Sequence, residues 1–276
     1  MSETKPAPGE TTAAAEPVKK ILQKEIEIDA PLDQVWKALT DPEELVRWFP
    51  LEARVTPGVG GKIFLSWGPS WEGEAPIVGW EPGKRFAVQE KLALIEWTLE
   101  SRGGKTIVRL VQSGFSTGAA WEDEWFDSTN YGWGFMLAGL RFALERHRGE
   151  PRMVAWPRVK TTLSRDEAYA RLAAPGALFA QAFGDPRGQQ VPDGSAYALT
   201  TESGETLSGT VEFVRPPRGF CLRVAEWNDA LLWATIEGTP GELEVQLWLS
   251  AFGLTPDTLS AWETRWRRKL EQIYHP

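Results

Sequence analysis

The chain has 276 residues, of which 42% are hydrophobic and 25% charged, a composition typical of a globular protein large enough for two domains. The net charge of −8 argues against nucleic acid or an acidic membrane surface as a partner, because both attract basic proteins. The single cysteine, Cys221, cannot form an intramolecular disulfide, and no apolar run is long enough to cross a bilayer. These features predict a soluble, cytoplasmic protein with no membrane partner.

The first predicted elements follow a tail at residues 1–18, which we expect to be disordered because it is nearly free of large apolar groups and has no signal-peptide core. Apolar and polar residues alternate up to Ile28, which predicts a strand that starts at Ile21. Pro31 then suits the first turn of a helix, and Pro42 can open a second, shorter helix.

From residue 50 onwards the pattern is that of strands separated by tight turns. Five strands are predicted, over residues 62–67, 71–80, 85–91, 92–101 and 106–113. A long helix over 121–148 follows, in which Trp133, Leu137, Leu140 and Leu144 recur at helical spacing and indicate one buried face. This order of elements predicts an α+β architecture, with a curved antiparallel sheet wrapped around a long C-terminal helix.

The order of elements recurs in the second half, at an offset of about 133 to 137 residues. The matching pairs include Ile26 and Val159, Leu39 and Leu172, Pro42 and Pro175, Phe86 and Phe220, Val108 and Val245, and Leu110 and Leu247. We therefore expect a domain at 19–151 and a diverged second copy at 157–276. The second closing helix, 260–274, is shorter, which predicts a smaller cavity or none.

Several short motifs occur in one order over residues 20–150: Ile28-Asp29-Ala30-Pro31, Val35-Trp36-Lys37-Ala38-Leu39-Thr40-Asp41-Pro42, Gly60-Gly61-Lys62-Ile63-Phe64, Trp80-Glu81-Pro82-Gly83-Lys84-Arg85-Phe86 and Ser113-Gly114-Phe115. With them the first unit resembles the activator of heat-shock-protein-90 ATPase homologue family of the START/SRPBCC superfamily. The resemblance implies a helix-grip (Bet v 1-like) fold with a hydrophobic cavity between sheet and helix. Members of the superfamily bind lipids, polyketides and hormones, and some catalyse cyclisation or hydrolysis.

Candidates for catalysis are few. The two histidines, His147 and His275, are expected to be solvated at helix ends, so a Ser-His-Asp or Cys-His system has no suitable base. Zinc-ligand spacing is absent, and the sequence predicts neither a metal nor a cofactor. The acidic cluster 121–127 could bind a cation or supply general acids, but we favour acidic residues in a first helical turn, where they complement the helix dipole.

The cavity hypothesis depends on aromatic residues, with Glu90, Glu96 and Arg109 as the polar candidates on strands. Predicted ligand contacts are Trp67, Trp71, Trp80, Phe86, Trp97, Arg109, Trp125, Tyr131, Trp133 and Met136. The leading hypothesis is a non-enzymatic protein that binds a small apolar molecule in the first domain. A cyclase or hydrolase that uses Glu90, Glu96 or Arg109 is the first alternative. An interaction module or chaperone regulator with an exposed apolar patch is the second, and a homodimer is left open.

Overall fold

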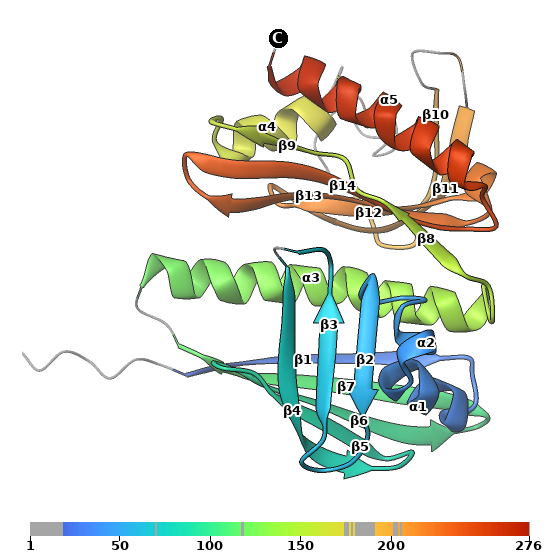
Figure 1. The fold of residues 1–276 in the computed structure, drawn as a ribbon. Helices are drawn as coiled ribbons and strands as arrows, with labels where there is room; N and C mark the ends of the chain where they lie inside the picture. The colour runs from blue at the N-terminus through green and yellow to red at the C-terminus, as the bar shows by residue number, and fades with distance from the viewer. Residues whose placement is uncertain are drawn as a thin grey trace, which may run out of the picture.

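The computed structural model describes residues 19–69, 71–116, 119–173, 177, 179, 191–200, 204 and 206–275. The tail predicted at 1–18 and Pro175 of the internal repeat lie outside these residues. Two antiparallel sheets face each other across one long helix (Figure 1). In the described part of the chain, no helix combines the length and the apolar character needed to span a membrane.

The first half forms one sheet of seven strands in the order β1-β7-β6-β5-β4-β3-β2. Its elements in chain order are β1 (Lys20–Ile28), α1 (Leu32–Thr40), α2 (Pro42–Leu45), β2 (Glu52–Thr56), β3 (Lys62–Ser66), β4 (Glu72–Glu81), β5 (Arg85–Gln89), β6 (Leu94–Arg102), β7 (Lys105–Phe115) and α3 (Ala120–Glu145). The predicted strands and helices are all present, and β2 is an additional edge strand.

The first sheet bends sharply in the middle of β4. The first half of this strand pairs with β3 up to Pro76, and the second half pairs with β5 from Ile77 onwards, with a register shift before Gly79. Proline has no N–H to donate to a ladder, and a bulge increases local twist, so the strand turns where it changes partner. As a result β2, β3 and the start of β4 run nearly across the other strands and form a side wall (Figure 1).

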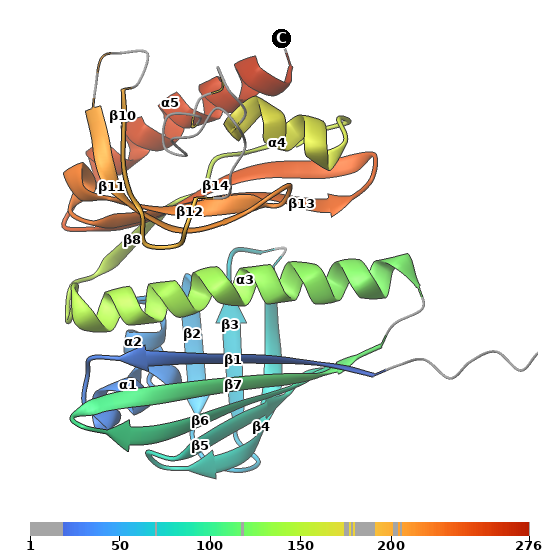
Figure 2. The ribbon, with the colours of Figure 1, turned by 180° about the vertical axis from the view of Figure 1, so that it is seen from behind.

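Helix α3 has two buried faces, whereas the sequence indicated one. Trp133, Leu137 and Leu140 pack into the core of the first sheet. Tyr131 and Phe135 pack instead against the second sheet. Residues two apart on a helix differ by about 200° in direction, so these two sets point to opposite sides. Figure 2 shows α3 lying between the two sheets.

The second half contains β8 (Arg152–Ala155), β9 (Arg158–Thr161), α4 (Arg165–Ala173), β10 (Ala196–Thr200), β11 (Thr206–Arg215), β12 (Gly219–Val224), the 3-10 turn η2 (Ala225–Trp227), β13 (Ala230–Thr239), β14 (Glu242–Phe252) and α5 (Pro256–Tyr274). Its strand order is β10-β11-β12-β13-β14-β8, with β9 also paired to β14. Strand β8 and Trp156, which precede the boundary predicted at residue 157, therefore lie with the second sheet.

Six strands follow the same order in the two halves, β1-β7-β6-β5-β4-β3 in the first and β9-β14-β13-β12-β11-β10 in the second, and one pair of positions shows the same register. Ile26 of β1 lies opposite Val108 of β7, and Val159 of β9 lies opposite Val245 of β14. These are the residues that the internal repeat pairs with each other. The shared register supports a duplication, and common ancestry of the two halves stays a prediction.

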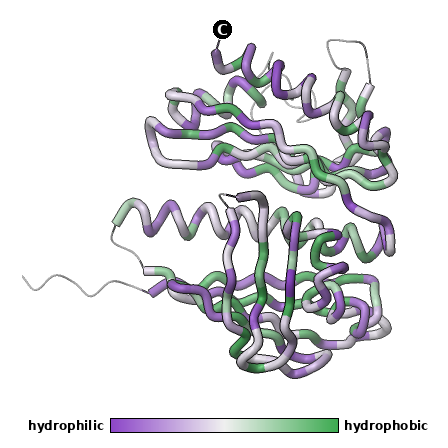
Figure 3. Tube along the Cα trace, in the orientation of Figure 1, coloured by the Kyte–Doolittle hydropathy of each residue, from purple (hydrophilic) through white to green (hydrophobic). Residues whose placement is uncertain are grey.

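Aromatic rings fill the space beneath α5 in the second half. Phe179 stacks on Trp266 with ring centroids 5.6 Å apart, and it contacts Phe220 edge-on at 4.9 Å. Strand β13 is buried along most of its length, because α3 covers one face of the second sheet and α4 and α5 cover the other. Hydrophobic residues accordingly run through the strands of both sheets (Figure 3).

The contact between the halves is apolar in the middle and ionic at one end. Phe135 stacks on Trp233 with ring centroids 4.5 Å apart. Near the start of α3, Glu124 accepts hydrogen bonds from Arg165 at 2.8 Å and from Arg218 at 3.0 Å. Both arginines belong to the second half, so Glu124 of the acidic cluster joins the two halves.

Candidate functional site

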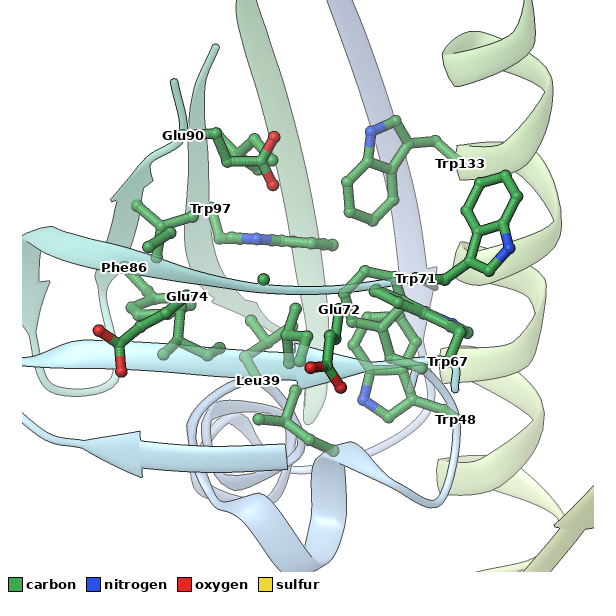
Figure 4. A pocket seen from close by; sticks show the side chains of 18 of the residues that line it. Leu39, Trp48, Trp67, Trp71, Glu72, Glu74, Phe86, Glu90, Trp97 and Trp133 are labelled. Carbon is green, nitrogen blue, oxygen red and sulfur yellow. The ribbon is translucent and has the colours of Figure 1, made fainter. Parts of the chain in front are cut away.

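A cavity of about 530 Å³ lies inside the first domain, between the bent sheet and α3. Strands β3 to β6 form its walls, α1 and α2 close one end, and α3 contributes Trp133 (Figure 4). Its apolar lining includes Leu39, Leu45, Trp48, Phe49, Ile63, Leu65, Trp67, Ala75, Phe86, Val88, Ile95, Trp97 and Trp133. A hollow of this size and lining is typical of sites for small ligands.

Trp133 is fixed at the boundary of this cavity by polar and aromatic contacts. Its indole N–H donates to Oε1 of the buried Gln112 at 2.6 Å. Its ring stacks on Phe49 at 5.5 Å and meets Trp97 edge-on at 5.3 Å. Trp48 is fixed in a similar way, since its N–H donates to the carbonyl of Ala38 at 2.7 Å. These aromatic walls are therefore preorganised and need little ordering when a ligand binds.

The charged residues that line the cavity are all exposed, at its mouth: Glu72, Glu74, Glu90 and Lys91. Glu74 is paired with Lys62 at 2.7 Å, and Glu72 lies beside Trp71, which is 56% exposed. Glu90 is exposed on one side, yet the partial loss of water around its carboxylate raises its pKa. A carboxyl group with a raised pKa can hold a proton or accept one near a bound ligand.

The loop that carries Glu90 depends on one glycine. Gly114 has φ of 104°, and a Cβ added there would lie 1.9 Å from the carbonyl oxygen of Leu92. The loop is closed by the N–H of Glu90, which donates to the carbonyl of Ala93 at 2.8 Å. Only glycine allows β7 to pass so close to this loop.

Six of the residues singled out from the sequence line this cavity: Trp67, Trp71, Phe86, Glu90, Trp97 and Trp133. The predicted ligand contacts did not include Trp48 and Phe49, although the turn after α2 brings both to the end of the cavity. The signal was present in the adjacent aromatic pair that follows this short helix. Whether any of these side chains contacts a ligand stays a prediction.

Two of the three polar candidates point away from the cavity. Glu96 accepts a hydrogen bond from Nε of Arg85 at 2.8 Å. Arg109 donates to Glu25 at 2.6 Å and to another strand carboxylate, that of Glu100, at 2.9 Å. Since neighbouring residues on a strand point to opposite faces, Trp97 faces the core while Glu96 lies on the outer face of the sheet.

Four aromatic or apolar candidates also lie elsewhere. Trp80 packs edge-on against Trp36 of α1 at 5.3 Å. Tyr131 faces the second sheet, and its hydroxyl donates to the carbonyl of Ala234 at 3.0 Å. Trp125 and Met136 line a separate groove between the two halves. Trp80 lies on the same face as its cross-strand neighbour Phe86 but is not part of the cavity lining, whereas the three residues of α3 line the groove or face the second sheet.

His147 is not solvated, contrary to the expectation from its position at the end of a helix. It is 4% exposed and stacks on Phe252 with ring centroids 4.1 Å apart. Its Nδ1 lies 3.2 Å from the carboxylate of Glu150. It lies far from the cavity in the packing between α3 and the second sheet, so it does not supply a base there. Among the described residues, no group of three or more His, Cys, Asp or Glu side chains is arranged to hold a metal ion.

The first half of the chain matches a known protein family. Residues 29–145 match the family model "Activator of Hsp90 ATPase homolog 1-like protein". The solved Aha1 dimer from Colwellia psychrerythraea is 21% identical, with 47% of this chain and 99% of that chain covered and a TM-score of 0.42. A protein from Staphylococcus saprophyticus is 19% identical, with 46% and 93% covered and a TM-score of 0.42. DynU16, from the dynemicin biosynthetic locus, is 14% identical, with 92% and 95% covered and a TM-score of 0.40. A search of curated proteins found no match.

Proposed function

Since residues 29–145 form an Activator of Hsp90 ATPase homolog 1-like domain, we propose that this domain binds a small hydrophobic molecule in its sheet–helix cavity without transforming it. The observation that carries the proposal is the cavity of about 530 Å³ walled by Trp67, Trp97 and Trp133. The close-packed core of a domain without such a cavity would contain only voids with room for at most a few water molecules.

The free energy available for binding comes from apolar burial. A ligand that removes on the order of 300 Å² of apolar surface from water gains about 7.5 kcal/mol at about 25 cal/mol per Å². Part of this gain is offset by the translational and rotational entropy that the ligand loses on binding. The fixed positions of Trp48 and Trp133 keep the further cost of ordering side chains small.

The test is a titration with N-phenyl-1-naphthylamine, an uncharged probe whose fluorescence rises in apolar surroundings. Gly73 lines the cavity opposite Leu65, and a Cβ added to it meets nothing within 4 Å. Gly73→Phe should therefore fill the cavity and weaken binding at least tenfold. The matched control is Val78→Phe, which adds a ring to the exposed side of the same strand and should bind as the wild type does. Equal affinity of Gly73→Phe and Val78→Phe would contradict the proposal, as would a wild-type protein that leaves the probe unchanged.

A second candidate function is a hydrolase or cyclase, and it depends on Glu90 alone. The raised pKa of this carboxyl is the specific observation in its favour, since Glu96 and Arg109 point away from the cavity. Hydrolysis of p-nitrophenyl butyrate by the wild-type protein, lost in Glu90→Gln, would support it. Equal rates with and without protein would remove it for ester substrates.

The remaining expectations about partners and location stay predictions. Trp71 and Trp121 are exposed by 56% and 57%, which is the feature that a chaperone regulator would need. Capture of purified chaperone by the full chain, weakened in Trp121→Ser, would support that alternative. A cytoplasmic location and a homodimer can be tested by fractionation and by sedimentation.

A further inference from the structure

A second hollow, of about 430 Å³, lies between the two halves and adjoins the proposed cavity at Trp67 and Trp71. We call it the interdomain groove. Tryptophans line it from three directions: Trp67 and Trp71 from the β3–β4 connection, Trp121 and Trp125 from α3, and Trp233 and Trp248 from the second sheet. Three of these six, Trp67, Trp71 and Trp125, were predicted from the sequence to line a cavity of the first domain.

The tryptophans of this groove differ in how far they are buried. Trp248 and Trp233 are 2% and 9% exposed and form its floor, whereas Trp121 and Trp71 are more than half exposed at its sides. Exposed indole surface is costly in water unless a partner covers it. A flat molecule placed over the floor would contact several ring faces at once, and aromatic stacking adds to the affinity beyond the burial of apolar area.

The charges beside the groove balance each other. Its two carboxylates belong to Glu124 and Glu237. Glu124 is paired with Arg165 at 2.8 Å, and Arg218 donates to Glu124 at 3.0 Å and to Glu237 at 2.9 Å. Two carboxylates and two guanidinium groups leave no net charge to attract an ion, so the groove suits an uncharged ligand.

The wall shared with the cavity carries a hydrogen-bond donor. The indole nitrogen of Trp67 is buried and has no acceptor within the described part of the chain. A buried donor without a partner is destabilising, and a turn of the Trp67 ring would let this N–H donate to a carbonyl oxygen of a ligand. The ligand chemistry that meets all three features is a planar ring system without charge that carries a carbonyl group.

We propose that the interdomain groove is a second binding site, which takes a flat, uncharged polycyclic aromatic molecule with a carbonyl acceptor. The ligand lies over Trp233 and Trp248, between the side walls formed by α3 and the β3–β4 connection. The site exists only in the two-domain chain, because the floor and the side walls come from different halves.

The test uses acridone, a flat neutral molecule with a carbonyl group, and follows the anisotropy of its own fluorescence. Gly132 lies on α3 and lines the groove, and a Cβ added there meets nothing within 4 Å. Gly132→Leu therefore puts a side chain into the groove, and leucine favours a helix more than glycine does, so the variant should fold. We expect it to weaken acridone binding at least tenfold.

Two controls separate this site from the cavity. Gly134→Ala makes a comparable helix-favouring change two residues away, where the added Cβ makes an ordinary contact with Phe213 at 3.9 Å, and acridone binding should be unchanged. Gly73→Phe, which fills the cavity, should also leave acridone binding unchanged. The proposal is overturned if the wild type does not bind acridone, if Gly132→Leu binds it normally, or if Gly73→Phe abolishes binding. It is also overturned if the charged analogue 9-anthracenecarboxylate binds as tightly.

Discussion

The hydrogen bond between Trp133 and Gln112 should contribute to stability mainly through the cost of leaving either partner alone. Both side chains are buried, at 7% and 3% exposure, and the N–H donates at 2.6 Å. Trp133→Phe leaves the Gln112 carbonyl without a donor and also loses apolar contact. Since an unpaired buried polar group costs about 1–3 kcal/mol, we expect a total loss of about 2–4 kcal/mol in the free energy of unfolding.

The partner substitution has a related effect. Gln112→Leu leaves the indole N–H of Trp133 unpaired, which should cost about 1–3 kcal/mol. The double variant has no unpaired group at this position. Its loss should therefore be about 1–2 kcal/mol smaller than the sum of the two single losses, as expected for residues in direct contact.

The measurement is guanidinium unfolding followed by far-ultraviolet circular dichroism, because tryptophan fluorescence changes with the substitution itself. A control cycle combines Trp133→Phe with Leu270→Ala, since Leu270 lies in the core beneath α5, which is a separate cluster. The losses in this control should add. If the Trp133 and Gln112 losses also add to within about 0.5 kcal/mol, the reasoning from unpaired groups is wrong.

Three further predictions concern the cavity mouth and the contact between the halves. For Glu90, a raised pKa stabilises the folded chain below the ordinary pKa and the effect is lost as pH rises through the raised value, so Glu90→Gln should match the wild-type Tm at pH 4 and exceed it at pH 7. Gly114→Ala should cost more than about 2 kcal/mol, because the new methyl group meets the carbonyl of Leu92 at a positive φ. Arg218→Met leaves Glu124 and Glu237 with one cation fewer, and about 2–3 kcal/mol should be lost in thermal unfolding, below the range for fully buried pairs because Glu124 is 24% exposed.

Each of these three predictions has a result that would contradict it. A Tm difference for Glu90→Gln that is the same at both pH values would show that the carboxyl keeps its ordinary pKa. Wild-type stability in Gly114→Ala would mean that β7 and the Glu90 loop can separate at little cost. An unchanged Tm in Arg218→Met would assign the contact between the halves to the apolar cluster alone.

The sequence predicted which side chains share a face of a strand, because alternation depends only on the geometry of the chain. Phe86 and Val88 share a face as expected and are both buried, and Trp97 is buried on the neighbouring strand. The outer position of Glu96 follows from the same alternation once the concave side is known. Its ion pair with Arg85 could not be predicted, because it joins two strands and neither strand's sequence pattern indicates it. The concave side itself depends on long-range packing.

The second face of α3 could not be predicted from periodicity. Tyr131 and Phe135 look like further core residues of a single domain, and only the position of the second sheet separates them from Trp133. His147 was misplaced for a similar reason, since Phe252, which covers it, is distant in the sequence. Contacts of this kind depend on how the two halves dock, and the hydrophobic pattern of the sequence alone does not specify that docking.

The position of α3 between the sheets limits how the molecule can be divided. A fragment that ended after this helix would leave Tyr131, Phe135 and Phe142 facing water, and the second half alone would uncover Trp233 and Trp248. Either piece would expose a broad apolar surface and would tend to self-associate. Expression of single halves should therefore yield insoluble or aggregated protein, because each half needs the other to cover its apolar face.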